Sequence, residues 1–274
     1  MMDQLVPRGS CDCHVHIFDP SRPPPGKSAE ETPDATLSAY RAVQSTTGLE
    51  HAVIVQANGY GTDNTCMLEA VAELGASARG VAVVPPDASR QDLEDLDRRG
   101  VKGIRFHFLP GGFLTWEALP RLAKLAADLG WHAQVQFDGR TLADREQTLA
   151  ALPCTVVIDH IGKFLEPVDT SHEGFRSLLR LLERGNVWVK LAAPYEVSRS
   201  GPPDYADVGA LAKALAAAAP ERCVWASNWP HPWVQNAPTE AALIALLEEW
   251  VPDEARRHRV LVENAAELYG FDTA

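Results

Sequence analysis

The chain has 274 residues, 46% of them hydrophobic, and a formal net charge of −12 at pH 7. This charge argues against a nucleic-acid partner, because no basic stripe reverses it locally. No apolar run approaches the roughly 18 residues that a membrane span needs, and no basic start followed by an apolar segment predicts a signal peptide. The five cysteines are odd in number and lack CxxC spacing, which favours small buried thiols in a reducing cytoplasm.

Short apolar runs rich in β-branched residues alternate along the chain with longer amphipathic ones. We expect strands at 11–18, 52–57, 80–84, 101–108, 132–137, 154–160, 187–193 and 223–227. Segments of helical period lie between them, for example at 66–75, 91–100, 115–130, 174–185 and 207–220. Near-continuous Val/Ile runs are typical of a sheet that is covered on both faces.

Eight strands that are each followed by a helix predict a (β/α)₈ TIM barrel, formed as a single domain by residues 1–274. A doubly wound open sheet is less consistent with the sequence, because no glycine-rich phosphate turn follows the first strand. Residues 1–10 include LVPRGS, which spells a thrombin-type cleavage site, and we expect them to be a tail before the domain.

Polar side chains gather where the expected strands end, which is where TIM barrels carry their chemistry. His14 and His16 stand one residue apart in the first strand, so both imidazoles leave the same face. Each polar side chain has a structural explanation when taken alone, but their convergence on one mouth indicates a binding cavity. The further strand-end candidates are Asn58, Tyr60, Asn64, Arg105, His107, Gln134, Gln136, Asp159, His160, Lys190, Tyr195, Arg199, Asn228 and His231.

Five segments in order resemble the amidohydrolase superfamily, namely CDCHVHIFDP, GIRFHF, VVIDHIGK, VKLAAPYEVS and WASNWPHP. Within it they most resemble the branch that contains 2-pyrone-4,6-dicarboxylate hydrolase and related lactonases. The resemblance covers nearly the whole chain. It implies a barrel enzyme that hydrolyses a small carboxylated cyclic ester.

The resemblance leaves open whether the histidines bind a metal or a substrate. Metal-dependent members carry a histidine after strand 5 and an aspartate after strand 8, where this chain has Gln136 and Asn228. His14, His16 and His160 remain as a three-histidine zinc set, so a metal-dependent amidohydrolase or decarboxylase is the alternative. The lactonase branch implies no cofactor, with these three histidines polarising the substrate carbonyl and residue 228 beside the attacking water.

Asn228 complicates that mechanism because an amide cannot take a proton from water. Loss of a general base typically lowers a rate by about 10²–10⁴-fold. Three explanations stay open. In the first, Asn228 is an engineered replacement. In the second, the chain is a natural variant that uses another base, such as His231 or Asp159. In the third, the barrel binds a small acid without turnover.

The expected partner is a small anionic lactone, and the resemblance gives the residues that would bind it: Arg105, Asn58, Gln136, Tyr195 and Arg199. A guanidinium fork suits a carboxylate. The stretch LPGGF after strand 4 lacks the second arginine of the dicarboxylate hydrolases, which predicts fewer or differently placed acidic groups on the substrate. Assembly into a homo-oligomer is left open by the sequence.

Overall fold

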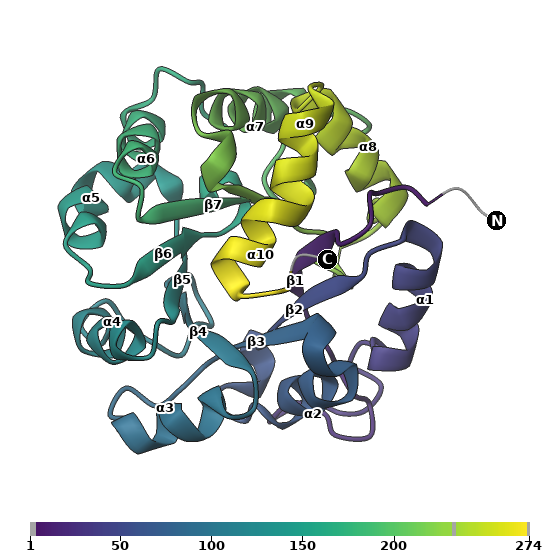
Figure 1. The fold of residues 1–274 in the computed structure, drawn as a ribbon, viewed down its shortest axis with the longest axis vertical. Coiled ribbons are helices and arrows are strands. Elements are labelled where there is room, and N and C mark those ends of the chain that lie inside the picture. Colours follow the sequence, from purple (N-terminus) through teal and green to yellow (C-terminus); the bar gives the residue numbers. More distant parts are fainter. Residues whose placement is uncertain (1–3, 232–233, 273–274) are drawn as a thin grey trace.

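The computed structural model describes residues 4–231 and 234–272. Eight parallel strands follow one another around a barrel in chain order (Figure 1). They are β1 Cys11–Val15, β2 His51–Val55, β3 Ala78–Ala82, β4 Val101–His107, β5 His132–Gln136, β6 Thr155–Ile158, β7 Val187–Leu191 and β8 Cys223–Trp225. The predicted TIM barrel is confirmed, and each strand overlaps its expected range.

The barrel closes between the ends of β1 and β8. The Asn228 amide donates to the His14 carbonyl over 3.0 Å, and the His16 amide donates to the Trp229 carbonyl over 2.9 Å. Val15 and Trp229 form a parallel bridge at the same place. This closure brings residues more than two hundred positions apart into one strand-end loop cluster.

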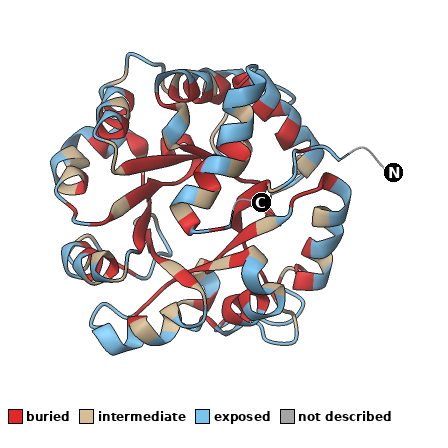
Figure 2. Cartoon of the chain, viewed as in Figure 1, coloured by how far each residue is buried: buried red, intermediate tan, exposed pale blue. Residues whose placement is uncertain are grey.

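Helices surround the strands and bury one face each (Figure 2). In α6, for example, Phe175, Leu178 and Leu181 are fully buried, and burial of each such side chain stabilises the fold by about 1.5–3 kcal/mol. The outer helices are α1 Leu37–Thr47, α2 Thr65–Leu74, α3 Arg90–Asp97, α4 Leu119–Asp128, α5 Leu142–Ala150, α6 Glu173–Glu183, α7 Ala206–Ala218 and α8 Glu240–Trp250.

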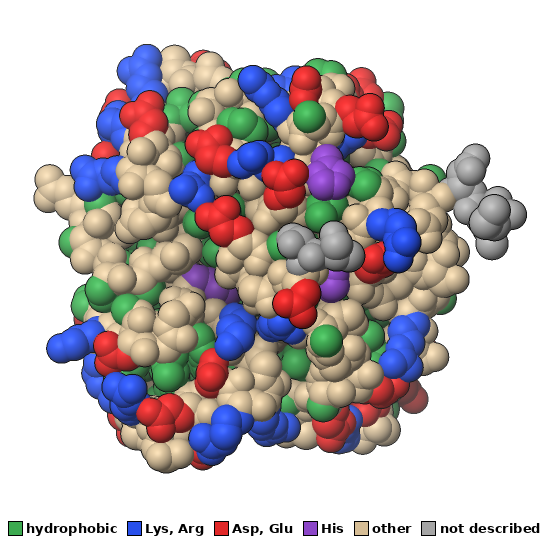
Figure 3. All heavy atoms as spheres, viewed as in Figure 1, with side chains coloured by type: hydrophobic (Ala, Val, Ile, Leu, Met, Phe, Trp, Pro, Cys, Tyr) green, Lys and Arg blue, Asp and Glu red, His purple; other side chains and the backbone are tan. Residues whose placement is uncertain are grey.

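The C-terminal segment covers the amino ends of the strands. It consists of α9 Glu254–His258, a π-helical turn Arg259–Glu263 and α10 Asn264–Tyr269, and α10 lies across the barrel in Figure 1. The Asn264 side chain donates to the Cys223 carbonyl over 2.7 Å, and Arg79 donates to the Tyr269 carbonyl over 3.2 Å. Because this segment covers the amino ends, a small molecule reaches the barrel from the opposite, carboxyl end. Acidic and basic side chains are interspersed on the covered face, which is drawn in Figure 3.

Residues 4–10 pack against the barrel, although the sequence suggested a tail. Val6 is buried, and the Leu5 amide donates to the Thr47 carbonyl over 3.0 Å. All five cysteines are buried and free, as expected. Within the described ranges, no helix is long and apolar enough to cross a membrane.

Candidate active site

A cavity of about 230 Å³ opens at the carboxyl ends of the strands. It is lined by His16, Phe18, Ala57, Asn58, Gly59, Arg105, His107, Gln136, His160, Glu196 and Asn228. A larger cavity of about 420 Å³ lies at the opposite end, between the N-terminal segment and α10. The smaller cavity is the candidate site, because buried polar side chains from five strands or the loops after them converge on it.

The loops around the cavity contain unusual backbone conformations. His160, Lys163, Ala193, Asn228 and His231 all have φ between +50° and +62°. Non-glycine residues adopt this left-handed region rarely, and such strain gathers at functional sites. Asparagine tolerates it better than most residues, so the backbone itself favours Asn at position 228.

His14 and His16 lie side by side, as their spacing predicts, with their Nε2 atoms 3.1 Å apart. The hydrogen-bond partners assign their tautomers. His16 Nδ1 lies 2.8 Å from the Val55 carbonyl oxygen, which only accepts, so this nitrogen carries the proton. Burial, reinforced by Arg105, lowers the pKa of His16 to about 3, so the ring is neutral and its Nε2 accepts from His14 Nε2.

His14 is fully buried beneath the cavity and does not line it. Its Nδ1 is left as an acceptor, 3.3 Å from Lys190 Nζ and 3.4 Å from Gln134 Nε2. Neither His14 nor His16 therefore has a free N–H for a substrate carbonyl. The expected role of this pair as carbonyl donors does not fit these tautomers, because their protons are already committed to each other and to Val55.

Lys190 and Asp159 form a buried ion pair under the two histidines. Lys190 Nζ donates to Gln134 Oε1 over 2.7 Å and lies 3.6 Å from Asp159 Oδ1. Gln134 Nε2 donates to Asp159 Oδ2 over 3.0 Å. Burial favours a raised pKa for Asp159, but Lys190 and the neighbouring charges hold its pKa below the usual value. The carboxylate is thus already neutralised by a lysine of the same chain.

His160 follows Asp159 directly after β6 and lines the cavity. Its ring centroid lies 4.9 Å from that of His14, and its Nδ1 has no hydrogen-bond partner. Burial lowers the pKa of His160 well below its usual value, although Asp159 opposes the shift. A neutral His160 therefore keeps one N–H, and the residue lines the cavity.

Arg105 provides a buried positive charge at the cavity. Only 4% of the residue is exposed. Its Nη1 donates to the Gln56 carbonyl over 2.6 Å and its Nη2 to Gln136 Oε1 over 3.3 Å, while Nε has no partner. Burial lowers the pKa of Arg105 to about 10, which leaves the guanidinium charged at neutral pH. The predicted anion-binding residues Arg105, Gln136 and Asn58 are therefore brought together.

Asn228 sits at the end of a hydrogen-bonded chain. Its Nδ2 donates to the Tyr195 hydroxyl over 3.0 Å and to Glu196 Oε1 over 3.1 Å. The Tyr195 hydroxyl lies 2.6 Å from His231 Nδ1, and His231 Nε2 lies 3.1 Å from Glu240 Oε1. Tyr195 is thus connected to the cavity through Asn228. His231 is separated from Asn228 by two hydrogen bonds, with Tyr195 between them.

Arg199 lies outside this cluster. Its side chain is 71% exposed and lies 3.5 Å from Glu166, while its backbone amide donates to Asp207 over 2.7 Å. The carboxylate-binding role expected for Arg199 is not supported by this position, because its side chain is exposed and does not line the cavity. Asn64 binds the backbone of Thr62 and Val83 and holds loops together.

Two charged residues at the mouth were missed from the sequence, Glu196 and Lys163, and they form an ion pair. Lys163, in the loop after β6, is held by the loop after β5, because the Gly139 amide donates to its carbonyl over 3.1 Å. A Cβ on Gly139 would lie 2.3 Å from the Gly162 carbonyl oxygen, so only glycine permits this approach. Lys163 belongs to the motif IGK and Glu196 to the motif PYE, and both motifs had indicated the site. The two residues lie in loops, where no regular spacing predicts the direction of a side chain.

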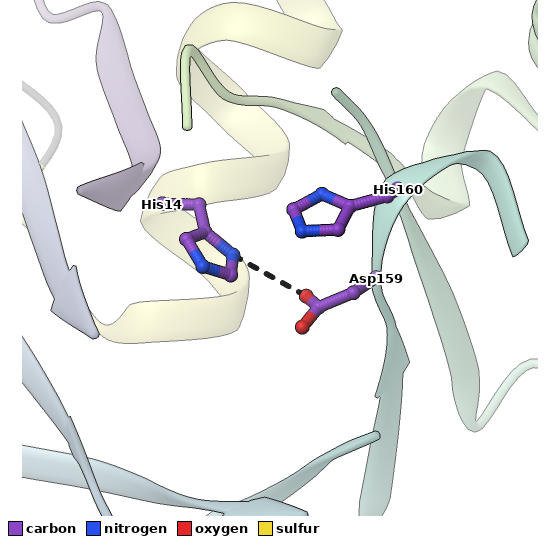
Figure 4. Close-up of side chains that lie close together, drawn as sticks. All are labelled: His14, Asp159 and His160. Atoms are coloured by element: carbon purple, nitrogen blue, oxygen red, sulfur yellow. Dashed lines mark ion pairs between the residues drawn. The ribbon is translucent and has the colours of Figure 1, made fainter. Parts of the chain in front are cut away.

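The residues nearest to a metal set differ from the expected three histidines. His14, Asp159 and His160 carry possible ligand atoms within 4.8 Å of one another (Figure 4). Asp159 Oδ1 accepts no hydrogen bond, but it lies 3.4 Å from His14 Nδ1 and 3.6 Å from Lys190 Nζ. A divalent ion bound by His14 and Asp159 would face the Lys190 ammonium in this small space. These residues therefore do not fit zinc well.

The barrel with polar residues from β1, β4, β6 and β8 at one mouth defines an amidohydrolase-type architecture. The amidohydrolase family matches residues 11–271, and the chain belongs to this family.

Individual relatives cover nearly the whole chain. The chain is 38% identical over 268 residues to D-galactarolactone isomerase from Agrobacterium fabrum. The matched region covers 96% of this chain and 91% of that protein. The chain is 32% identical over 277 residues to 2-pyrone-4,6-dicarboxylate hydrolase from Comamonas testosteroni, over 96% and 91% of the two chains. An apo crystal structure from Agrobacterium tumefaciens superposes with a TM-score of 0.88 at 37% identity, covering 98% of each chain.

Proposed function

We propose that this protein opens a small, negatively charged lactone by acyl transfer at the ring carbonyl, without a metal ion. The observation that carries the proposal is the buried Arg105 beside His160 in a cavity of about 230 Å³. The relatives named for a galactarolactone and a pyrone dicarboxylate support the substrate class.

Arg105 and His160 are the donors proposed for the substrate. Both residues line the cavity, the buried Arg105 Nε–H has no acceptor in the protein, and the neutral His160 ring has one N–H to donate. Donors fixed in a buried site stabilise developing negative charge strongly, because no solvent reorganisation is needed. Since the chain carries a net charge of −12, Arg105 provides the local positive charge that an anion requires, whereas Lys163 is paired with Glu196.

The metal-free part of the proposal rests on Lys190. Its ammonium sits against Asp159 and His14, where metal-dependent chemistry would need a cation to bind. His16 then lines the site, and the buried His14 holds it in place from beneath. The expected zinc alternative has the weaker support, because its ligand set would place like charges together.

Hydrolysis is the first form of this reaction, with water as the acyl acceptor. The test is to add pyrone dicarboxylate and galactarolactone to the purified protein and record turnover by pH-stat and NMR. Hydrolysis converts the ester to an acid and releases one proton per turnover at neutral pH. Absence of turnover with carboxylated and uncarboxylated lactones alike would contradict the proposal.

Isomerisation is a second candidate, and Asn228 favours it. The Asn228 amide cannot take a proton from water. A hydroxyl group of the bound substrate is already in the cavity, so it can attack the ring carbonyl without a separate water molecule being bound. The hydroxyl oxygen would bond to the ring carbonyl, the old ring C–O bond would break, and the proton would pass to the released oxygen. New ring signals in the NMR spectrum without proton release would assign this reaction.

A further inference from the structure

Glu196 is a carboxylate at the cavity that the expected mechanism does not use. It ends a 3₁₀ turn, Pro194–Glu196, that follows β7, and its side chain is 25% exposed. Among the cavity-lining residues that the structure describes, Glu196 is the only acid. The other polar groups there are amides, imidazoles and the Arg105 guanidinium.

The carboxylate is held from two sides. Lys163, in the loop after β6, pairs with Oε2, and Asn228, after β8, donates to Oε1 over 3.1 Å. Lys163 is itself largely buried. Three strand-end loops therefore meet at Glu196, which fixes the direction of a group that would otherwise be free at the rim.

Of the two side chains at positions 196 and 228, only that of Glu196 can carry a charge. The residue after β8 is Asn228, a neutral amide that donates to the acid in the preceding loop. Two carboxylates at hydrogen-bond distance would not both ionise. The carboxylate at this end of the cavity therefore comes from the loop after β7, and the residue after β8 holds it with a hydrogen bond.

We infer that Glu196 is the catalytic residue that accepts the proton of the attacking hydroxyl, an inference that rests on the proposed lactone reaction. The imidazoles are poor competitors for this role, because burial lowers the pKa of His16 to about 3 and the pKa of His160 well below its usual value. Asp159 lies below the cavity and is paired with Lys190.

The step balances with the residues present. The O–H bond of water or of a substrate hydroxyl breaks, its proton goes to a Glu196 oxygen, and its oxygen bonds to the lactone carbonyl carbon. The carbonyl oxygen takes up the electron pair. Collapse then breaks the ring C–O bond, and the released oxygen takes the proton back from Glu196, so the enzyme ends unchanged.

The test compares Glu196→Gln with the wild type on a lactone that the wild type turns over. We expect kcat to fall by about 10²–10⁴-fold, because the glutamine keeps the hydrogen bond from Asn228 but cannot accept a proton. KM changes little, and formate or azide added to Glu196→Ala restores part of the rate. Glu166→Gln, which removes an exposed acid paired with Arg199, keeps the wild-type rate and is the matched control.

The pH profile separates catalysis from a structural ion pair. The groups that contact Glu196 are Lys163 and Asn228, and Tyr195 and His231 follow behind Asn228. We expect an acidic limb in the kcat profile of the wild type that is absent in Glu196→Gln. A Glu196→Gln variant with kcat within about tenfold of the wild type, or with its acidic limb intact, overturns the inference. If the wild type turns over no lactone, the proposed function fails instead.

Discussion

The side-chain amide of Asn228 donates a hydrogen bond of 3.1 Å to the carboxylate of Glu196, so an amide and an acid from adjacent loops form one unit at the mouth of the barrel. The same amide group donates to Tyr195 over 3.0 Å. An aspartate at position 228 would have no hydrogen for either contact.

Asn228→Asp is therefore expected to destabilise the protein rather than to complete its active site. Asparagine and aspartate both tolerate the left-handed backbone at this position, where φ is +62°. The new carboxylate would face Glu196, so its pKa would be raised in the folded state, and the penalty would grow as pH rises. We expect the free energy of unfolding in urea to fall by about 1–3 kcal/mol at pH 8 and by less at pH 5. Equal stability of the two proteins at pH 8 would contradict this account.

Lys190→Met should be strongly destabilising because it leaves Asp159 buried without its cation. Loss of one partner of a buried ion pair typically removes about 3–5 kcal/mol from the free energy of unfolding. Lys213→Met is the matched control, since Lys213 pairs with Glu249 on the surface and such pairs contribute about 0–1 kcal/mol. Chemical denaturation of both variants checks the prediction. Similar losses in the free energy of unfolding for the two variants would contradict the role of Lys190 as the buried partner of Asp159.

Arg105 and Arg199 should separate clearly in substrate binding. Arg105→Gln removes the buried cation of the cavity, and we expect KM for a carboxylated lactone to rise by about 10–150-fold, the loss of a charged hydrogen bond of 1.5–3 kcal/mol. Arg199→Gln changes an exposed side chain and should leave the kinetics as they are. A rise of KM in the Arg199 variant comparable to that in the Arg105 variant would restore the role expected from sequence.

Buried histidines should make the fold labile to acid. Burial lowers the pKa of both His16 and His132 to about 3. Between pH 6.5 and 3 the unfolded chain binds protons that the folded chain does not, so this stability is present above pH 6.5 and is lost as pH falls. Each such group contributes at most about 1.4 kcal/mol per pH unit.

The variant His132→Phe tests this linkage away from the cavity. His132 lies at the start of β5 and packs against Tyr269. Urea unfolding between pH 6.5 and 4 should show a shallower loss of stability for His132→Phe, by roughly the slope of one proton. The exposed His258, changed to Gln, should leave the slope as in the wild type. Parallel slopes for the wild type and His132→Phe would contradict a neutral buried imidazole.

The repeated alternation of strand and helix was readable from the sequence because parallel strands buried on both faces need continuous apolar runs. The strand-end rule also found Arg105 and His160, because a strand fixes which side chains reach the mouth.

The loop residues could not be placed in this way. Glu196 and Lys163 meet only because left-handed turns after β6 and β7 point them at each other, and no periodicity encodes those turns. Arg199 lies three residues beyond Glu196 yet points to the surface. The tautomers of His14 and His16 likewise depend on Val55 and Lys190, which the motif HxH does not reveal.

The most direct measurement is lactone turnover by protein stripped of metal with a chelator, with its zinc content determined on the same sample. We expect a small carboxylated lactone to be opened at the same rate before and after stripping, in a sample with far less than one zinc per chain. Activity that disappears with the metal and returns on addition of zinc would contradict it, and would make His14, Asp159 and His160 a metal site.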